Sequence, residues 1–344
     1  METVIIKDTN ERSLKEAGRI IKSGGLVAFP TETVYGLGAS AYDDMAVKKI
    51  YQAKGRPSDN PLIVHIADVS DVKKVAREVP PLAEKLLEKY APGPFTVILK
   101  KRPDISDTVT AGLDTVGVRI PSHPVAREFI RSSGVPVAAP SANLSGKPSP
   151  TKAEHVIEDM MGRIDAIICG GDCGVGVEST IIDFTCDIPT ILRPGGITIE
   201  NLIEVCGSGQ VDRHVLESVG ELETPKCPGM KYKHYSPDAD VTVVEGSGRS
   251  VAEKVSVLCK KAKLDGKTVG VLAEKDCGFD ADWFISSGSD NKQFANRLFS
   301  ALREFDEKNI DTVFVQFSNQ DSYGLAVKNR LYKSAGNKVI YTEK

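Results

Sequence analysis

Residues 54–66, with the sequence KGRPSDNPLIVHI, join a cationic turn to an apolar strand. Lys54 and Arg56 flank a glycine, and Pro57 and Pro61 brace the turn that follows. Because proline fixes its own φ angle and restricts the residue before it, the turn should be stiff. An ammonium and a planar guanidinium held on a stiff turn are suited to binding a polyphosphate or a carboxylate. A solvated surface turn is the alternative for this stretch alone, and the remaining motifs decide against it.

Composition sets the broad class of the protein. A chain of 344 residues, 41% hydrophobic and 26% charged, predicts a globular protein with two domains. The formal net charge of −3 argues against broad, sequence-independent binding to nucleic acid, which requires a basic surface. The sequence has no apolar run of transmembrane length and no signal-peptide pattern at its start, so we expect a cytoplasmic protein without a membrane segment.

The seven cysteines are scattered and form no Cys-x-x-Cys pair. Neither a disulfide framework nor a cysteine-based metal site is therefore expected.

Polar side chains recur at the ends of predicted strands. The predicted strand 26–29 runs into PTETVYGLG (residues 30–38), where hydroxyls, one carboxylate and an aromatic ring lie between a proline and two glycines. His65 lies in an apolar strand, where a single histidine is usually a core residue. Arg119 lies among β-branched residues in the predicted strand 115–120. Because a buried arginine is costly unless it is paired, we expect an anionic partner, either an internal carboxylate or a bound one.

Two further loops contain closely spaced hydrogen-bond donors. Residues 141–151 hold serines, an asparagine and a lysine between prolines, and residues 170–183 combine glycines with a serine and a threonine at the start of a strand. No G-x-x-x-x-G-K-[ST] motif is present, which excludes a P-loop. The cations at these turns and strand ends predict one convergent anion site: Lys54, Arg56, Arg119, Lys147 and Arg193.

The C-terminal part of the chain has a simpler pattern. From Asp240 onward, predicted strands near Val241, Val269, Val313 and Val339 alternate with predicted helices. This alternation predicts a small parallel α/β domain.

The motifs together resemble those of the YrdC family in its longer, two-domain form. The resemblance covers residues 23–197, and the motifs occur in the family's order: PTETVYGLG, KGRPSDNPLIVHI, VGVRIP, APSANLSG, GVESTIID and ILRPGG. It implies an α/β fold with a twisted mixed sheet and flanking helices over residues 1–210. A linker or lid would span residues 211–239, and a smaller Rossmann-like domain residues 240–344.

The resemblance also implies a nucleotidyltransferase reaction. L-Threonine, bicarbonate or CO2, and ATP with Mg²⁺ would give threonylcarbamoyl-AMP and pyrophosphate, the first step of threonylcarbamoyladenosine formation in tRNA. A downstream transferase complex would use the product, so tRNA would be an indirect partner. No dedicated protein site for a metal is expected.

The site residues implied by the resemblance fall into two groups. The threonine group is Thr33, His65, Arg119, Ala139 and Ser179. The nucleotide group is Lys54, Arg56, Asn60, Thr115, Ser141, Asn143, Ser149, Arg193, His234 and Tyr235, with Lys54 and Arg56 as the catalytic cations.

Two other functions are open to this sequence. A non-catalytic RNA-binding module would use the same cations to contact phosphates and would bind RNA without turning over ATP. A carbamoyltransferase of the hydrogenase-maturation type also contains a YrdC-like domain, but it carries zinc-finger cysteine pairs that this sequence lacks.

Overall fold

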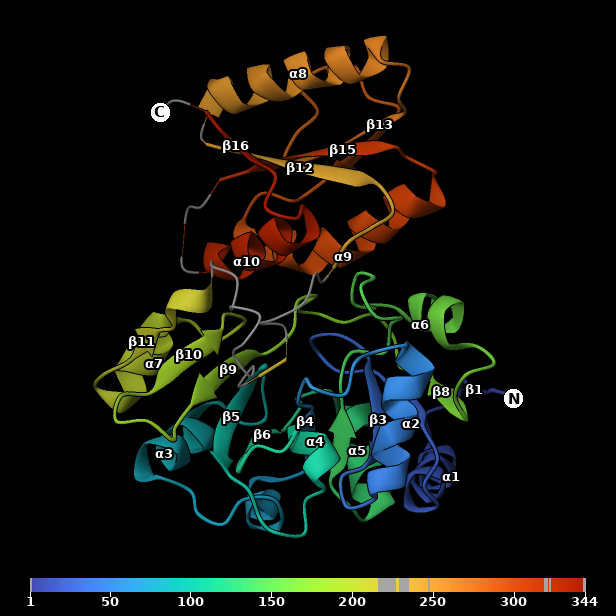
Figure 1. The fold of residues 1–344 in the computed structure, drawn as a ribbon, viewed down its shortest axis with the longest axis vertical. Helices are drawn as coiled ribbons and strands as arrows, with labels where there is room; N and C mark the ends of the chain where they lie inside the picture. The colour runs from blue at the N-terminus through green and yellow to red at the C-terminus, as the bar shows by residue number, and fades with distance from the viewer. Residues whose placement is uncertain are drawn as a thin grey trace. The chain divides into compact units, whose positions relative to one another are not determined.

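The computed structural model describes residues 2–215, 227–228, 235–246, 248–318, 321 and 323–342. The chain forms two compact units, which we describe separately (Figure 1). The first unit comprises Met1–Ser145 and Ser149–Lys231, and the second comprises Gly146–Pro148 and Tyr232–Lys344. A tripeptide from the middle of the first unit's sequence thus belongs to the second unit.

The described part of the first unit is built on a mixed, eleven-stranded sheet. Antiparallel pairs (β2–β3, β3–β7, β7–β4, β6–β5 and β9–β10) alternate irregularly with parallel ones. The predicted mixed sheet is therefore confirmed. Its strands, in hydrogen-bonded order, are β1 (Val4–Ile6), β8 (Ala166–Ile168), β2 (Val27–Phe29), β3 (Gly36–Ser40), β7 (Val137–Ala139), β4 (Ile63–His65), β6 (Thr115–Arg119), β5 (Phe95–Lys100), β9 (Thr180–Asp183), β10 (Thr190–Arg193) and β11 (Gln210–Val211).

Short helices flank this sheet. They are α1 (Glu11–Lys22), α2 (Asp44–Lys54), α3 (Pro81–Tyr90), α4 (Asp107–Thr110), α5 (Pro124–Ser133), α6 (Ala153–Met160) and α7 (Ile199–Cys206), with two 3₁₀ helices, η1 (Val69–Lys74) and η2 (Arg213–Val215). Helix α1 begins where the Asn10 side chain accepts a hydrogen bond from Ser13 N, and it buries Leu14, Ala17 and Ile21. Capping and an apolar face together explain why this segment is helical.

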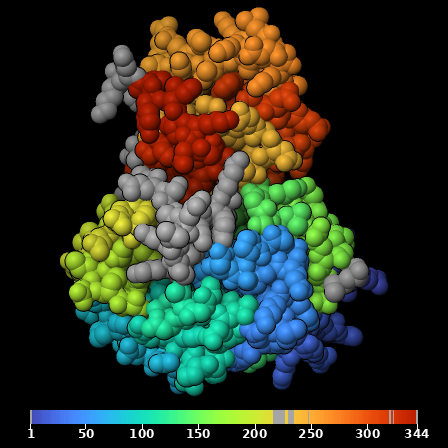
Figure 2. Space-filling model, viewed as in Figure 1, coloured from blue at the N-terminus to red at the C-terminus, as the bar shows by residue number. Residues whose placement is uncertain are grey.

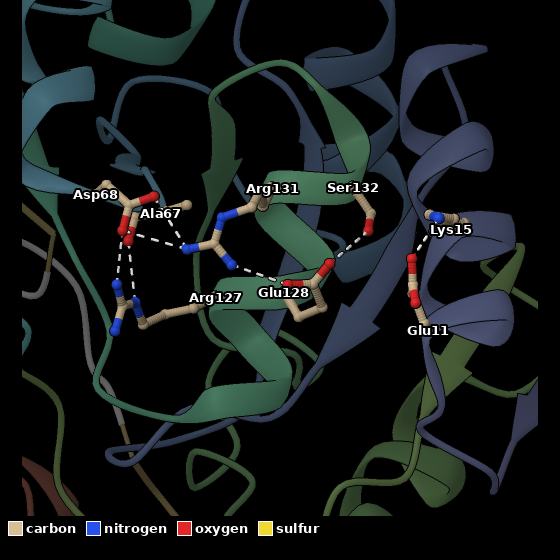
Figure 3. Close-up of polar contacts among 8 residues, drawn as sticks. All are labelled: Glu11, Lys15, Ala67, Asp68, Arg127, Glu128, Arg131 and Ser132. Carbon is tan, nitrogen blue, oxygen red and sulfur yellow. Dashed lines mark hydrogen bonds and ion pairs between the residues drawn. The ribbon is translucent and has the colours of Figure 1, made fainter.

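The polar and apolar pattern of residues 69–77 predicts an α-helix, and this prediction is wrong, because the segment forms the shorter 3₁₀ helix η1. Asp68 precedes it but makes no capping hydrogen bond. Its carboxylate instead pairs with Arg127 (2.6 Å) and Arg131 (3.0 Å) of α5, as Figure 3 shows. The residue that would have capped an α-helix is used in tertiary contacts.

Helices α2 and α4 show how distant segments close around the sheet. The Asp44 carboxylate accepts hydrogen bonds from Ser106 Oγ (2.7 Å) and from the Thr108 hydroxyl. The surfaces of α2, in blue, and of the segment around α4, in teal, lie side by side in Figure 2. These contacts hold the N-terminal end of α2 against the α4 segment, and Lys54 lies at the opposite end of the helix.

The described part of the second unit is a parallel α/β domain, as predicted. Its strands lie in the order β14 (Trp283–Ser286), β13 (Val269–Ala273), β15 (Thr312–Phe317), β12 (Asp240–Glu245) and β16 (Val339–Tyr341). Helix α8 (Gly248–Leu264) covers one face, and α9 (Asn291–Glu307) and α10 (Gly324–Ser334) cover the other (Figure 1). The sequence analysis missed β14, a short and half-buried edge strand.

Candidate active site

Lys54 is the last residue of α2, and its side chain is turned into the protein. Gly55 caps the helix in the left-handed conformation (φ 62°). The ammonium donates hydrogen bonds to Ser141 O and Asn143 O, both at 2.5 Å, and only 3% of the residue is exposed. Ser145 N in turn donates to Lys54 O (2.9 Å). Lys54 therefore joins the cationic turn of residues 54–61 to residues 141–151, which we call the serine-rich loop. The two segments are separated by almost 90 positions in the sequence.

Asn60 is buried in the same turn with its amide unused. The residue is 0% exposed, and neither Oδ1 nor Nδ2 has a hydrogen-bond partner among the described residues. Its backbone carbonyl is held by Tyr51 Oη at 3.1 Å. A buried amide without partners is costly unless a ligand completes its hydrogen bonds, so Asn60 is suited to a binding role. Arg56, in the same turn, is half-buried.

Three adjacent strands bring together part of the predicted threonine group. His65 at the end of β4 pairs in register with Arg119 at the end of β6. Ala139 ends the antiparallel neighbour β7 and therefore lies opposite Ile63, at the start of β4. The sheet thus places His65 and Arg119 side by side, although they come from two separate motifs, and places Ala139 two residues along β4 from His65.

The anionic partner of Arg119 is an internal carboxylate. Its Nη2 lies 2.9 Å from Glu32 Oε1 and 3.4 Å from Thr31 Oγ1, and the residue is 4% exposed. Its Nε is buried without a hydrogen-bond partner in the described part of the chain. Glu32 was not among the predicted site residues, although the carboxylate of PTETVYGLG was visible in the sequence. The predicted Thr33 lies beside this pair, with its hydroxyl 3.0 Å from that of Thr31.

His65 is neutral in the folded protein. Burial, reinforced by the positive charge of Arg119, lowers the pKa of His65 to about 3. Its ring makes an edge-to-face contact with Phe29, with 5.8 Å between centroids, and Nδ1 has no hydrogen-bond partner among the residues described. A histidine with so low a pKa is a weak base, which favours a role in shaping or hydrogen-bonding the ligand.

Ser179 and Arg193 join the two predicted groups. Arg193 donates from Nε to Ser179 O (3.0 Å) and from Nη2 to Ser179 Oγ (3.2 Å). Ser179 Oγ also lies 2.8 Å from Thr96 Oγ1. The backbones here pass so closely that a Cβ on Gly195 would lie 2.4 Å from Thr180 N, which explains the glycine in RPGG.

The serine-rich loop is ordered by its own side chains. Ser141 Oγ donates to Asn143 Oδ1 at 2.5 Å. Ser149 Oγ donates to Glu178 Oε1, also at 2.5 Å, and both of those residues are buried. Glu178 is a second carboxylate that the sequence analysis did not assign.

Two more predicted residues can be located, and a third cannot. Thr115 begins β6, about 13 Å along the strand from Arg119. It lines a narrow cavity with Thr96, which contacts Ser179, and with Pro228, whose carbonyl accepts a hydrogen bond from Arg193. Tyr235 belongs to the second unit and stacks on Phe299, with 5.0 Å between ring centroids. His234 lies outside the described residues. The cation Lys147 also belongs to the second unit.

Comparison with known proteins gives the family. A family model described as "Telomere recombination", named for Sua5, YciO and YrdC, matches residues 19–195, and the model for the C-terminal domain of threonylcarbamoyl-AMP synthase matches residues 197–336. The threonylcarbamoyl-AMP synthase of Bacillus subtilis is 48% identical, over 96% of this chain and 95% of the relative. The chain belongs to the threonylcarbamoyl-AMP synthase family. The predicted family and enzyme class are thereby confirmed.

Two archaeal comparisons agree with membership in the threonylcarbamoyl-AMP synthase family. The family member from Pyrococcus abyssi is 46% identical, over 96% of both chains. A crystal structure of P. abyssi Sua5 complexed with L-threonine has 44% identity and a TM-score of 0.95, with all of both chains covered. These relatives favour the catalytic function over the RNA-binding alternative. The described residues include no helix long and apolar enough to cross a bilayer.

Proposed function

We propose that the chain condenses L-threonine, bicarbonate or CO2, and ATP into threonylcarbamoyl-AMP and pyrophosphate, with the residue roles given below. The observation that carries the proposal is the linkage of the two residue groups in one unit. Arg193, a nucleotide residue, donates to Ser179, a threonine residue. Within the same unit His65 lies beside Arg119, and Lys54 is bonded to Ser141 and Asn143.

Arg119 would bind the threonine carboxylate. Its guanidinium is buried and keeps an unused donor at Nε, and a bound carboxylate is the natural acceptor for that donor. Glu32 would keep the cation neutralised and oriented before threonine binds, because an isolated buried charge is costly. Thr33, His65, Ala139 and Ser179 would form the rest of the threonine pocket.

The chemistry requires a water-poor site and neutralised phosphates. The threonine amine and bicarbonate form a carbamate with loss of water, and the carbamate oxygen then attacks the α-phosphorus of ATP while pyrophosphate leaves. Lys54 and Arg56 would neutralise charge that develops on the phosphoryl oxygens. Positioning and charge neutralisation suffice for such a transfer, so no nucleophilic side chain is needed.

The remaining nucleotide residues would hold ATP. Asn60 offers an unused buried amide, and Arg193 offers a buried guanidinium. The others assigned to the nucleotide are Thr115, Ser141, Asn143, Ser149, His234 and Tyr235.

We further propose that Mg²⁺ enters with ATP. Mg²⁺ commonly keeps several waters and binds through substrate phosphates with one or two protein oxygens. The described residues contain no group of three or more His, Cys, Asp or Glu that could hold a metal. The Ser141 and Ser149 hydroxyls, the Asn143 amide and the Glu178 carboxylate are the oxygens that could complete its shell. When bound, Mg²⁺ would neutralise the charge on the phosphates.

The product would serve a separate transferase complex that modifies tRNA, so the tRNA would be an indirect partner. The expected cytoplasmic location remains a prediction.

Pyrophosphate release tests the function directly. Purified protein with ATP, Mg²⁺ and bicarbonate should release pyrophosphate with L-threonine, and much less with L-serine, glycine or no amino acid. Release that does not depend on threonine, or no release at all, would contradict the proposal.

Arg119→Ala tests the threonine assignment. We expect the variant to lose at least 100-fold in kcat/KM for threonine, because a buried charge-assisted pair is removed. Arg131→Ala is the matched control, since Arg131 is an exposed arginine whose surface ion pairs are worth little. Circular dichroism should show both variants folded, and threonine-dependent activity retained by folded Arg119→Ala would overturn the assignment.

A further inference from the structure

Helix α9 of the second unit holds the tip of the serine-rich loop. Arg303 donates two hydrogen bonds to Pro148 O, from Nη2 at 2.7 Å and from Nε at 3.2 Å. Arg303 is 3% exposed, and Pro148 is also buried. Two donors on one carbonyl fix the direction of that carbonyl, and burial excludes the water that would otherwise compete for it.

The same helix holds the segment that carries Tyr235. Phe299 stacks on Tyr235 with an interplanar angle of 29°, and Asp306 Oδ1 accepts hydrogen bonds from Asp238 N (2.9 Å) and Ala239 N (3.3 Å). Ser236 N donates to Gly146 O at 2.9 Å. One face of α9 therefore binds residues 146–148 and residues 235–239, and these two segments are also bonded to each other.

The carbonyl that Arg303 holds belongs to the peptide bond leading into Ser149. The orientation of this peptide plane sets the position of the Ser149 backbone, and the Ser149 side chain already donates to Glu178. Further along, Pro150 O accepts a hydrogen bond from Tyr35 N at 2.8 Å. The loop is thus anchored on both sides of Ser149, and Arg303 supplies the anchor that precedes it.

We propose that Arg303 is a positioning residue for the nucleotide site, through which α9 sets the geometry of the loop carrying Ser141, Asn143 and Ser149. This inference rests on the proposed nucleotide role of that loop. It gives Arg303 a role through the chain itself, because Pro148 precedes Ser149 directly. Thr33, His65, Arg119 and Ala139 lie on β4, β6 and β7 and in the PTETVYGLG motif, whereas Ser179 follows Glu178, the partner of Ser149. We therefore expect threonine binding to depend much less on this anchor than ATP binding does.

The test compares the effect of a substitution at Arg303 on ATP binding with its effect on threonine binding. Arg303→Met keeps the bulk of the side chain but removes its donors, and we expect at least a tenfold increase in KM for ATP and in Kd for a non-hydrolysable ATP analogue. KM for threonine should stay within twofold. Arg303→Lys, which restores one donor, should recover part of the loss. Arg297→Met is the matched control, because Arg297 donates to Ser286 O from an exposed position on the same helix.

The outcomes separate this inference from the proposed function. If the unsubstituted protein does not bind the ATP analogue, the proposed function fails. If it binds but folded Arg303→Met binds equally well, or if affinity for both substrates falls together, only the positioning role of Arg303 is overturned. Near-UV circular dichroism shows whether each variant is folded. If Arg303→Met is unfolded, the same comparison is made with Arg303→Lys. Unchanged ATP affinity in folded Arg303→Lys would then overturn the inference.

Discussion

At the scale of single residues, burial decides the charge state of the site. His65 remains neutral in the folded protein down to a pH of about 3, whereas an unfolded chain protonates it near its ordinary value of 6.5. Between these values the unfolded state binds the extra proton, so acidification favours unfolding. Burial also lowers the pKa of His123, which acts in the same direction.

This difference predicts a pH-dependent stability. As the pH falls from 6.5 to 5, His65 should reduce the free energy of unfolding by up to about 1.4 kcal/mol per pH unit. His65→Gln removes this titration and should give a shallower pH dependence. Urea unfolding at several pH values measures both slopes, and equal slopes would mean that His65 is not held neutral. Because His65 is neutral throughout this range, its titration should not appear in the pH profile of activity.

At the scale of secondary-structure elements, α1 and α5 of the first unit pack closely at Gly18. A Cβ on Gly18 would lie 2.6–2.8 Å from backbone atoms of Ser132 and Ser133. Figure 3 shows these two helices, with Ser132 on α5 hydrogen-bonded to Glu128. The glycine lies within a helix, where alanine would ordinarily be preferred, so close packing explains its presence.

We therefore predict that Gly18→Ala is destabilising. Alanine gains about 1 kcal/mol of helix propensity, but forcing a methyl group against rigid backbone costs about 1–3 kcal/mol. The net effect should be a loss of up to about 2 kcal/mol, measured as a lower urea midpoint. Lys15→Ala, on the exposed side of α1, is the control and should change the midpoint little. A midpoint for Gly18→Ala equal to or above that of the parent protein would show that the helices separate at no cost.

At the scale of the whole molecule, the net charge and the burial of the site cations favour the enzyme over an RNA-binding module. The formal net charge is −3, and several of the site's cations are buried and bonded to protein groups: Lys54 to Ser141 O, Arg119 to Glu32, and Arg193 to Ser179. Cations used in this way are not displayed for contact with a long polyanion.

Pyrophosphate release should accordingly be independent of RNA. Adding tRNA at physiological salt should change the rate by less than twofold, because the net charge is negative and the site cations named above are buried. A filter-binding assay with the same tRNA should show only weak, strongly salt-dependent binding. An absolute requirement for tRNA in the release assay would contradict this prediction.

The sequence alone determined the local features of this protein. Apolar runs such as residues 115–120 specify strands, and the alternation after Asp240 specifies a parallel domain, because these patterns reflect which side of each element is buried. Motif order was sufficient to indicate the family and to nominate the site residues. Their roles remain proposals.

Only the tertiary structure decided which side chains meet. Glu32 pairs with Arg119, and Glu178 with Ser149, across separations that no local pattern encodes. Sheet order places β4 between β6 and β7. The tripeptide 146–148 belongs to the second unit because a helix almost 160 residues later supplies Arg303. The physical reason is that periodicity records burial along one element, whereas ion pairs and carbonyl anchors depend on how distant elements pack.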